Sequence, residues 1–314
     1  MSQYIVTGAG PVGWTIAEQL AERGNSVRIL TRSGSGPDHP LVEKLVVDVS
    51  DAAALATAIA GADAVFHCIH GSAYSTAAWQ RELPAAESVV LEAAGREGAV
   101  VVFPESLYSY SRPDQVMTEQ SERAAEGGKR GVRTALLAAR AASETNTVSV
   151  VASDFFGPRV RMAHAGERMV PAVLNGTGIQ LVGSPDAPHS FTYIPDLAAA
   201  MIAAADLPRV RDRVLHAPTL PALTQRALVE AFAETAGVAA PRLRGTPGWL
   251  FRAIGVVMPS MRELAEMSYQ FDRPFVMDST SSQLLLGLSP TPLDAAVAET
   301  VQWWRGELAA TASA

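Results

Sequence analysis

The sequence has 314 residues, of which 48% are hydrophobic and 18% are charged, and it carries a formal net charge of −7. These values are typical of a globular chain that buries a substantial core, and they exclude general disorder. The acidic balance also argues against a nucleic-acid or anionic-membrane partner, because such partners require clustered basic residues.

Cysteine usage and the lack of long apolar runs predict where the protein works. The only cysteine, Cys68, cannot form an intramolecular disulfide, and no spacing of cysteine and histidine indicates a metal site. No basic segment followed by an apolar run opens the sequence, and no stretch of about 18 uncharged apolar residues occurs. We therefore expect a soluble cytoplasmic protein.

The first half of the chain alternates short β-rich runs with helical segments. We expect strands at 4–6, 26–30, 45–47, 64–67, 99–103 and 148–151. We expect helices at 13–23, 51–61, 76–96 and 131–143. Apolar strands separated by helices are typical of parallel strands that are covered on both faces. The pattern predicts an α/β fold with a doubly wound parallel Rossmann sheet.

The second half has a different rhythm, with frequent glycine and proline and mostly helical segments. We expect helices near 165–174, 196–205, 224–236, 247–256, 260–268 and 292–305. These features predict a dinucleotide-binding domain over 1–155, joined by a segment that returns at about 190–206. The ranges 156–189 and 207–314 would then form a smaller, mostly helical substrate-binding lobe.

A glycine-rich loop follows the first predicted strand and opens the first predicted helix. It reads Thr-Gly-Ala-Gly-Pro-Val-Gly and comprises Thr7, Gly8, Ala9, Gly10, Pro11, Val12 and Gly13. Gly8 permits a tight turn, Gly10 lets the backbone approach a pyrophosphate, and Gly13 allows the helix to pack closely on the strand. The context predicts a dinucleotide site, and the alternative is a glycine-rich turn without a ligand.

The second predicted strand ends next to Arg32 and Ser33, where a reader of a ribose 2′-hydroxyl would be acidic. A guanidinium pairs with a 2′-phosphate, which an acidic side chain would repel. We therefore expect NADP(H) to be preferred over NAD(H), unless Arg32 is an ordinary surface arginine.

Several segments together resemble the extended short-chain dehydrogenase/reductases, the NAD-dependent epimerase/dehydratase family. They are the glycine loop, Asp48 with Val49, and the ranges 106–110, 152–158 and 191–198. The resemblance covers nearly the whole chain, and the glycine spacing is that of atypical members. It implies a cofactor site that also includes Asp48 and Val49 near the adenine, Cys68, Ile69 and His70 after the fourth strand, and Ser153 and Phe155 after the sixth. Cys68 and Ile69 could equally be core residues at a strand end.

The family's catalytic motif is present only in part. Ser106 matches its catalytic serine, although a serine there could also cap a turn. The family's Tyr-x-x-x-Lys falls on Lys129 and Arg133 here, and no tyrosine occurs between 111 and 192. The resemblance implies that Arg133 replaces the lysine in holding the ribose.

Three residues remain as candidate proton donors. Lys129 could donate a proton if Arg133 and partial burial depress its pKa, or it could bind cofactor phosphates or solvent. Tyr108 and Tyr110 follow the fifth strand and would share one face if that segment is extended. These alternatives stay open from the sequence alone.

The leading hypothesis is an NADP(H)-dependent oxidoreductase that transfers hydride to or from a small carbonyl, alcohol or enone. The alternatives are a non-catalytic NADP(H)-binding sensor, which the incomplete motif favours, and a sugar-nucleotide epimerase or dehydratase. The expected partner is a small-molecule substrate. Helices 76–96 and 131–143 would form a homodimer interface or pack internally.

Overall fold

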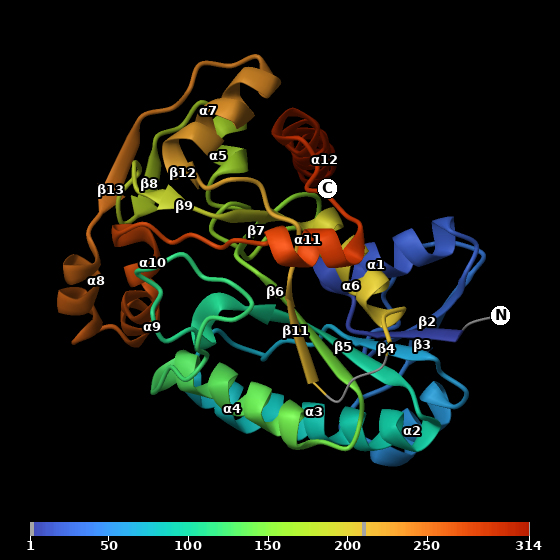
Figure 1. Cartoon of the computed structure of the whole chain (residues 1–314). Coiled ribbons are helices and arrows are strands. Elements are labelled where there is room, and N and C mark those ends of the chain that lie inside the picture. The colour runs from blue at the N-terminus through green and yellow to red at the C-terminus, as the bar shows by residue number, and fades with distance from the viewer. Residues whose placement is uncertain (1–2, 209–211, 314) are drawn as a thin grey trace.

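The computed structural model describes residues 3–208 and 212–313, and a seven-stranded parallel sheet lies at its centre (Figure 1). The strands run in the spatial order β11-β6-β5-β4-β1-β2-β3. Their bounds are β1 Gln3–Thr7, β2 Ser26–Thr31, β3 Val42–Val46, β4 Ala64–His67, β5 Val100–Ser106, β6 Thr147–Ala152 and β11 Asp212–His216. The order reverses between β1 and β4, and in such sheets ligands bind at the carboxyl ends of the strands beside that point.

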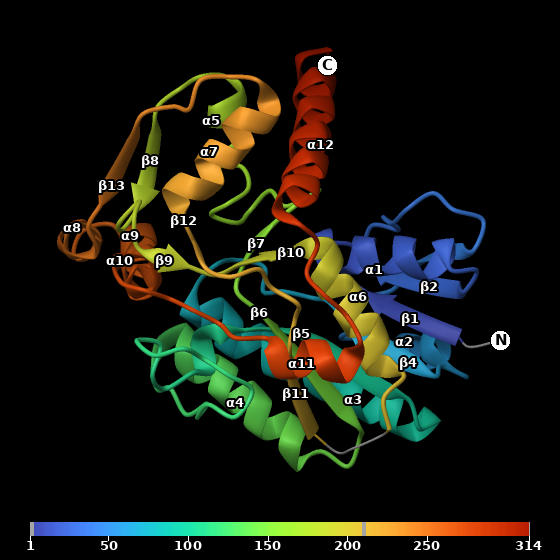
Figure 2. The ribbon, with the colours of Figure 1, turned by 45° about the horizontal axis from the view of Figure 1, so that its top comes forward.

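Helices cover both faces of the sheet, as Figures 1 and 2 show from two directions. One face carries α1 (Pro11–Glu22) and α6 (Ile194–Ala205), which pack on each other. The other carries α2 (Ala52–Ile59), α3 (Thr76–Glu97) and α4 (Gly128–Ala142). Alternation along β1 explains both cores, because Val6 belongs to the cluster beneath α1 and Ile5 to the cluster beneath α2 and α3. The predicted doubly wound sheet is confirmed.

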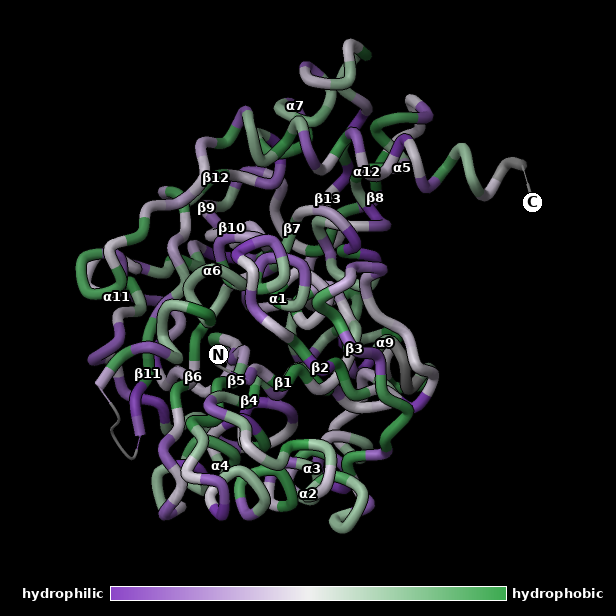
Figure 3. Tube along the Cα trace, turned by 90° about the vertical axis from the view of Figure 1, so that its right-hand side faces the viewer, coloured by the Kyte–Doolittle hydropathy of each residue, from purple (hydrophilic) through white to green (hydrophobic). Residues whose placement is uncertain are grey.

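Local sequence signals define the ends of these helices. Asp51 caps α2 by accepting hydrogen bonds from the backbone of Ala53 and Ala54. Gly98 ends α3 in the left-handed conformation, with φ +68°. Figure 3 shows that α3, α4 and α7 alternate hydrophobic and hydrophilic residues, as expected of helices with one face on a core.

A second lobe packs beside the carboxyl edge of the sheet. It contains α5 (Val170–Leu174), α7 (Gln225–Ala236), α8 (Gly248–Gly255), α9 (Pro259–Met267), α10 (Tyr269–Asp272) and α12 (Leu293–Ser313). Its short strands are β8 (Ile179–Val182) with β13 (Leu243–Thr246), and β9 (Pro188–His189) with β12 (Leu223–Thr224). Buried Phe156, Phe232 and Trp304 belong to its core. A further pair, β7 (Asp154–Phe156) with β10 (Phe191–Tyr193), connects this core to the sheet.

Three features differ from the sequence-based expectation. The strand β11 joins the edge of the sheet, although it lies inside the range 207–314 that was expected to belong to the lobe. Its first two residues are charged, and among the described strands it pairs only with β6. The strand β5 continues through Pro104 to Ser106. Beyond Val102 it pairs with β6 and no longer with β4, so the missing donor of Pro104 does not interrupt a β4 ladder. The helix α11 (Thr280–Leu286) beside β11 was not expected.

In the described ranges 3–208 and 212–313, no helix is long and apolar enough to cross a bilayer.

Candidate cofactor and active site

The glycine loop is held between β2 and β4 at the switch point of the sheet. Gly8 has φ +89°, and its backbone N–H donates to the carbonyl of Leu30 at 2.9 Å. A Cβ on Gly13 would lie 2.0 Å from the Gly8 carbonyl oxygen, so no larger residue fits there. These contacts fix the loop against the start of α1, as the glycine pattern predicts.

The N-terminus of α1 is open in front of this loop. Gly10 is the N-cap, no side chain caps the helix, and the first turn has no acidic residue. A Cβ on Gly10 would meet no atom within 4 Å. The free N–H groups and the open space fit the pyrophosphate of a dinucleotide, which an N-terminus without its own carboxylate attracts.

Charged and polar residues lie at the carboxyl ends of β2 and β3. Arg32, Ser33 and Asp48 are exposed, whereas Val49 is buried. Asp48 accepts hydrogen bonds from the Ser50 backbone at 3.0 Å and from its hydroxyl at 2.8 Å. These bonds, with a smaller contribution from Arg32, hold the pKa of Asp48 below its usual value. Arg32 thus lies beside a carboxylate in the region expected to meet the adenosine end of the cofactor.

The three predicted residues after β4 have different surroundings. Cys68 packs against the α1 side of the core and Ile69 against the α3 side, while His70 is exposed. Burial raises the pKa of the Cys68 thiol, which therefore stays protonated at neutral pH. The His70 ring meets the edge of Trp79 with centroids 4.7 Å apart.

The two candidate tyrosines point into different regions, because their segment is a 3-10 turn (η1, Leu107–Ser109) rather than an extended strand. The Tyr108 ring stacks on Trp79 of α3 at 6.1 Å, and its hydroxyl lies 3.0 Å from that of Tyr74. Burial, and secondly the Asp154 carboxylate, raise the pKa of Tyr108 to about 12. Tyr110 is fully buried, and its hydroxyl bonds to Nε2 of His216.

Lys129 is enclosed between α4 and α9. Its side chain is 0% exposed, and its ammonium contacts both Glu263 and Glu266, the latter at 2.9 Å. The ammonium also lies 3.3 Å from the Glu263 carbonyl and 4.7 Å from the centre of the Tyr74 ring. An ammonium has three donors, and three acceptors of the chain surround this one. Proton donation by Lys129 stays a prediction. In this arrangement the Lys129 ammonium would first have to break its contacts with Glu263 and Glu266.

Arg133, one turn further along α4, is buried at the carboxyl edge of the sheet. Its guanidinium lies 4.8 Å from the centre of the Trp79 ring and 3.4 Å from Oε1 of Glu105. Its Nε is buried and has no hydrogen-bond partner within the described ranges 3–208 and 212–313. Arg133, Tyr108 and His70 therefore meet on one indole ring, which brings three predicted site residues together.

The remaining predicted residues lie on either side of this cluster. Ser106 is half-buried, and its backbone and hydroxyl donate to Oε1 of Glu105 at 2.8 and 3.3 Å. Ser153 is buried, and its hydroxyl has no hydrogen-bond partner among the described residues, while its backbone N–H donates to the Thr192 hydroxyl at 3.0 Å. Phe155 packs on the core beneath α1.

Sequence reasoning missed several residues of the site. Trp79, Tyr74 and Glu105 lie inside or beside predicted elements, where an aromatic residue or a single carboxylate indicates nothing by itself. Asp154 bonds to Nε2 of His189 at 2.7 Å. Nδ1 of His189 lies 3.1 Å from the Gln270 carbonyl oxygen. No sequence pattern predicts this pair, because its members are 35 residues apart.

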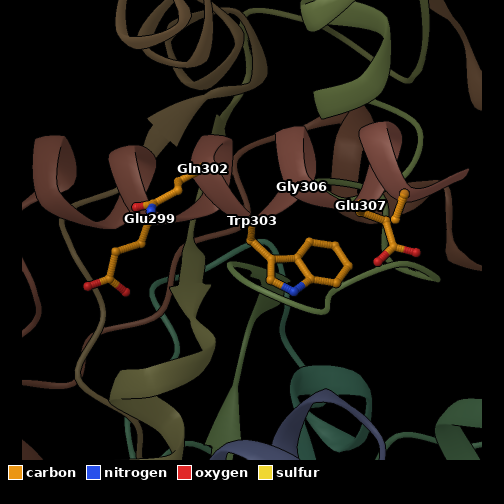
Figure 4. A pocket seen from close by; sticks show the side chains of 6 residues that line it. Glu299, Gln302, Trp303, Gly306 and Glu307 are labelled. Carbon is orange, nitrogen blue, oxygen red and sulfur yellow. The ribbon is translucent and has the colours of Figure 1, made fainter. Parts of the chain in front are cut away.

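A surface hollow of about 450 Å³ lies elsewhere, along α12. Figure 4 shows its lining, which consists of Glu299, Gln302, Trp303, Gly306, Glu307 and Ala310. None of these residues belongs to the carboxyl edge of the sheet, so the hollow is separate from the site described above.

Comparison with known proteins agrees with this architecture. The model of the NAD dependent epimerase/dehydratase family matches residues 4–214. The uncharacterized protein y4nG of Sinorhizobium fredii is 23% identical over 212 residues, which cover 65% of this chain and 53% of that protein. This chain thus spans about half the length of that relative. A 3-beta-hydroxysteroid dehydrogenase of Mycolicibacterium neoaurum is 39% identical over 69 residues, which are 21% of this chain and 19% of that protein.

Solved structures match almost the entire chain. The Bordetella bronchiseptica enzyme WbmH in complex with NAD+ has a TM-score of 0.75 at 20% identity, covering 97% of this chain and 98% of that one. MoeE5 in complex with UDP-glucose and NAD has a TM-score of 0.73 at 21% identity, covering 98% and 100%. The UDP-glucose 4-epimerase of Thermotoga maritima has a TM-score of 0.75 at 17% identity, covering 98% and 99%. At these identities the likeness shows the fold.

Proposed function

This chain belongs to the NAD dependent epimerase/dehydratase family, and from that premise we propose that it is a nicotinamide-dinucleotide-dependent enzyme that transfers hydride to or from a substrate carbon bearing a hydroxyl or carbonyl group. The observation that carries the proposal is the convergence of the open α1 N-terminus, Ser106, Tyr108 and Arg133 on one edge of the sheet. A mere glycine-rich turn would not need the other three residues.

Different residues at this edge of the sheet would bind different parts of the cofactor. The backbone at Gly8, Gly10, Pro11, Val12 and Gly13 would hold the pyrophosphate, and Arg133 with its free Nε would hold the ribose of the nicotinamide half. When bound, the dinucleotide supplies a hydride donor or acceptor at nicotinamide C4. Arg32 and Ser33 would face the adenosine ribose, and their exposed donors support a preference for NADP(H).

Tyr108 is our candidate for the group that moves the proton. With a pKa of about 12 it is protonated at neutral pH, so its hydroxyl donates to the substrate oxygen as hydride reaches the carbon. The Tyr74 hydroxyl at 3.0 Å then donates to the phenolate oxygen that remains. The Ser106 hydroxyl, whose single proton is donated to Glu105 at 3.3 Å in this structure, would turn to donate to the same substrate oxygen.

Two classes of substrate fit this chemistry. A small carbonyl, alcohol or enone would be reduced or oxidised with net change of the cofactor. A sugar nucleotide would be oxidised and reduced within one cycle, as an epimerase or dehydratase does, and the solved complexes of similar folds with UDP-glucose favour this second candidate. The missing tyrosine of the family motif favours the first.

One experiment separates the candidates. The purified protein is incubated with NADPH or NADH and a panel of ketones, aldehydes and enones, and separately with NAD(P)+ and a panel of sugar nucleotides. Absorbance at 340 nm reports net reduction, and chromatography of the sugar nucleotides reports isomers or dehydrated products without net change at 340 nm. Tight cofactor binding with no reaction on either panel would contradict an enzyme of these classes and favour a sensor.

A further inference from the structure

A buried charge network runs behind the proposed site, through the end of β5. Arg140 of α4 is 0% exposed and binds both carboxylate oxygens of Glu87 on α3, at 2.6 and 2.8 Å. Arg140 also donates to Oε2 of Glu105 at 2.8 Å. Two carboxylates therefore share one fully desolvated arginine, and one of them stands next to the site.

Glu105 is the member of this network that reaches the site. Its Oε1 accepts from the Ser106 backbone at 2.8 Å and from the Ser106 hydroxyl at 3.3 Å, and it lies 3.4 Å from Nη1 of Arg133. The strand β5 has already left β4 at this point, so Ser106 pairs on one side only, with Ala152 of β6. Through one carboxylate, Glu105 connects the anchored Arg140 to both Ser106 and Arg133.

The charge state of this carboxylate suits such a role. Burial alone would raise its pKa, but Arg133 and Arg140 hold the pKa of Glu105 below its ordinary value. This ionised, buried carboxylate holds Nη1 of Arg133, and Nε has no hydrogen-bond partner among the residues that the structure describes.

We propose that Glu105 is a positioning residue that orients Arg133 and Ser106 toward the dinucleotide and substrate; this inference rests on the proposed function. Glu87 is the matched control, because it binds the same Arg140 but, among the described residues, forms no hydrogen bond or ion pair with Arg133 or Ser106. A purely structural role of the network would make the two carboxylates equivalent.

The test compares Glu105→Gln with Glu87→Gln in the full chain. The readouts are the dissociation constants for NADPH and NADH, from the change in nucleotide fluorescence, and the Tm. We expect both variants to lower the Tm, and only Glu105→Gln to weaken nucleotide binding, by about tenfold or more, since the ion pair that orients Arg133 is lost. Unchanged binding in Glu105→Gln, or an equal loss in Glu87→Gln, overturns the inference.

Two further variants keep the test decisive. Should Glu105→Gln not fold, Glu105→Asp and Glu87→Asp retain the charge and are compared in the same way. In an Arg133→Met background, the loss caused by the Glu105 variant should largely disappear, because residues that act through one another are not additive; full additivity would overturn the inference. Wild-type protein that binds neither nucleotide would contradict the proposed function, and the inference with it.

Discussion

Arg32 is exposed directly after β2, and within the part of the chain that the structure describes it makes no hydrogen bond or ion pair. Its guanidinium is therefore available to a ligand, although the neighbouring Asp48 opposes a second negative charge. The relative affinity for NADP(H) and NAD(H) therefore depends on the combined effect of the Arg32 and Asp48 charges.

Replacing Arg32 by aspartate should reverse the preference. We expect the dissociation constant for NADPH to rise by about tenfold or more, with that for NADH little changed, because a charge-assisted contact to a 2′-phosphate becomes a repulsion. Titration of both nucleotides measures this, and Arg23→Asp at the end of α1 controls for net charge. An equal loss for both nucleotides would show that Arg32 does not read the 2′-position.

The two tyrosines of the β5 turn should respond differently to loss of their hydroxyls. Tyr108→Phe removes the proposed proton donor and should slow turnover by about 100-fold or more, with little effect on nucleotide binding. Tyr110→Phe removes the hydrogen-bond partner of Nε2 of the buried His216, and it should cost about 1–3 kcal/mol of stability while retaining turnover. Initial rates and denaturant unfolding measure both effects. Loss of turnover in Tyr110→Phe alone would reassign the donor.

At the scale of elements, ion pairs between α4 and α9 join the sheet domain to the lobe near the site. The N-terminus of α4 carries a partial positive charge, which repels the positive charge of Lys129. The Glu266 carboxylate offsets this repulsion, because it accepts a hydrogen bond from the Lys129 backbone N–H at 2.6 Å. Glu263 and Glu266 also accept from Thr76 at the start of α3, at 3.3 and 3.4 Å. One short helix of the lobe thus binds the starts of two helices of the sheet domain.

This junction predicts a stability effect. Lys129→Met should lower the free energy of unfolding by about 1–3 kcal/mol, less than for a fully buried pair because both glutamates are partly exposed and become hydrated. Denaturant unfolding with Lys44→Met, a surface lysine, as control measures it. A gain in stability would show that desolvation of Lys129 outweighs its two ion pairs.

The same elements explain what the sequence could and could not predict. The strands β1 to β6 and helices α1 to α4 follow from local periodicity, and the glycine loop follows from local backbone requirements. The partners of Lys129 lie at least 134 residues away, and no local pattern predicts which lobe helix approaches α4. The expectation that Tyr108 and Tyr110 share a face depended on an extended backbone, and a 3-10 turn separates them instead.

At the scale of the whole molecule, buried histidines should limit stability in acid. Burial lowers the pKa of His67 to about 3, and its Nδ1 lies 2.8 Å from the Thr7 hydroxyl. Because the unfolded chain binds a proton near pH 6.5 and the folded chain does not, stability is lost as pH falls from 6.5 toward 3. The slope is up to about 1.4 kcal/mol per pH unit for each such histidine.

Unfolding curves at several pH values measure that slope. His67→Asn, which retains a hydrogen-bonding group for Thr7 but cannot titrate in this range, should show a shallower dependence than the wild type. A slope identical in both would show that His67 does not contribute.

The proposed function requires that a dinucleotide binds in front of the N-terminus of α1. Titration of NADPH and NADH against the wild-type protein and Gly10→Val tests this most directly. The Cβ of the new side chain meets no protein atom within 4 Å, and the side chain extends into the space in front of the helix, so we expect the variant to keep its Tm. We predict saturable binding to the wild type and a loss of about tenfold or more in the variant. No binding to the wild type, or equal binding to both, would contradict the assignment of this site.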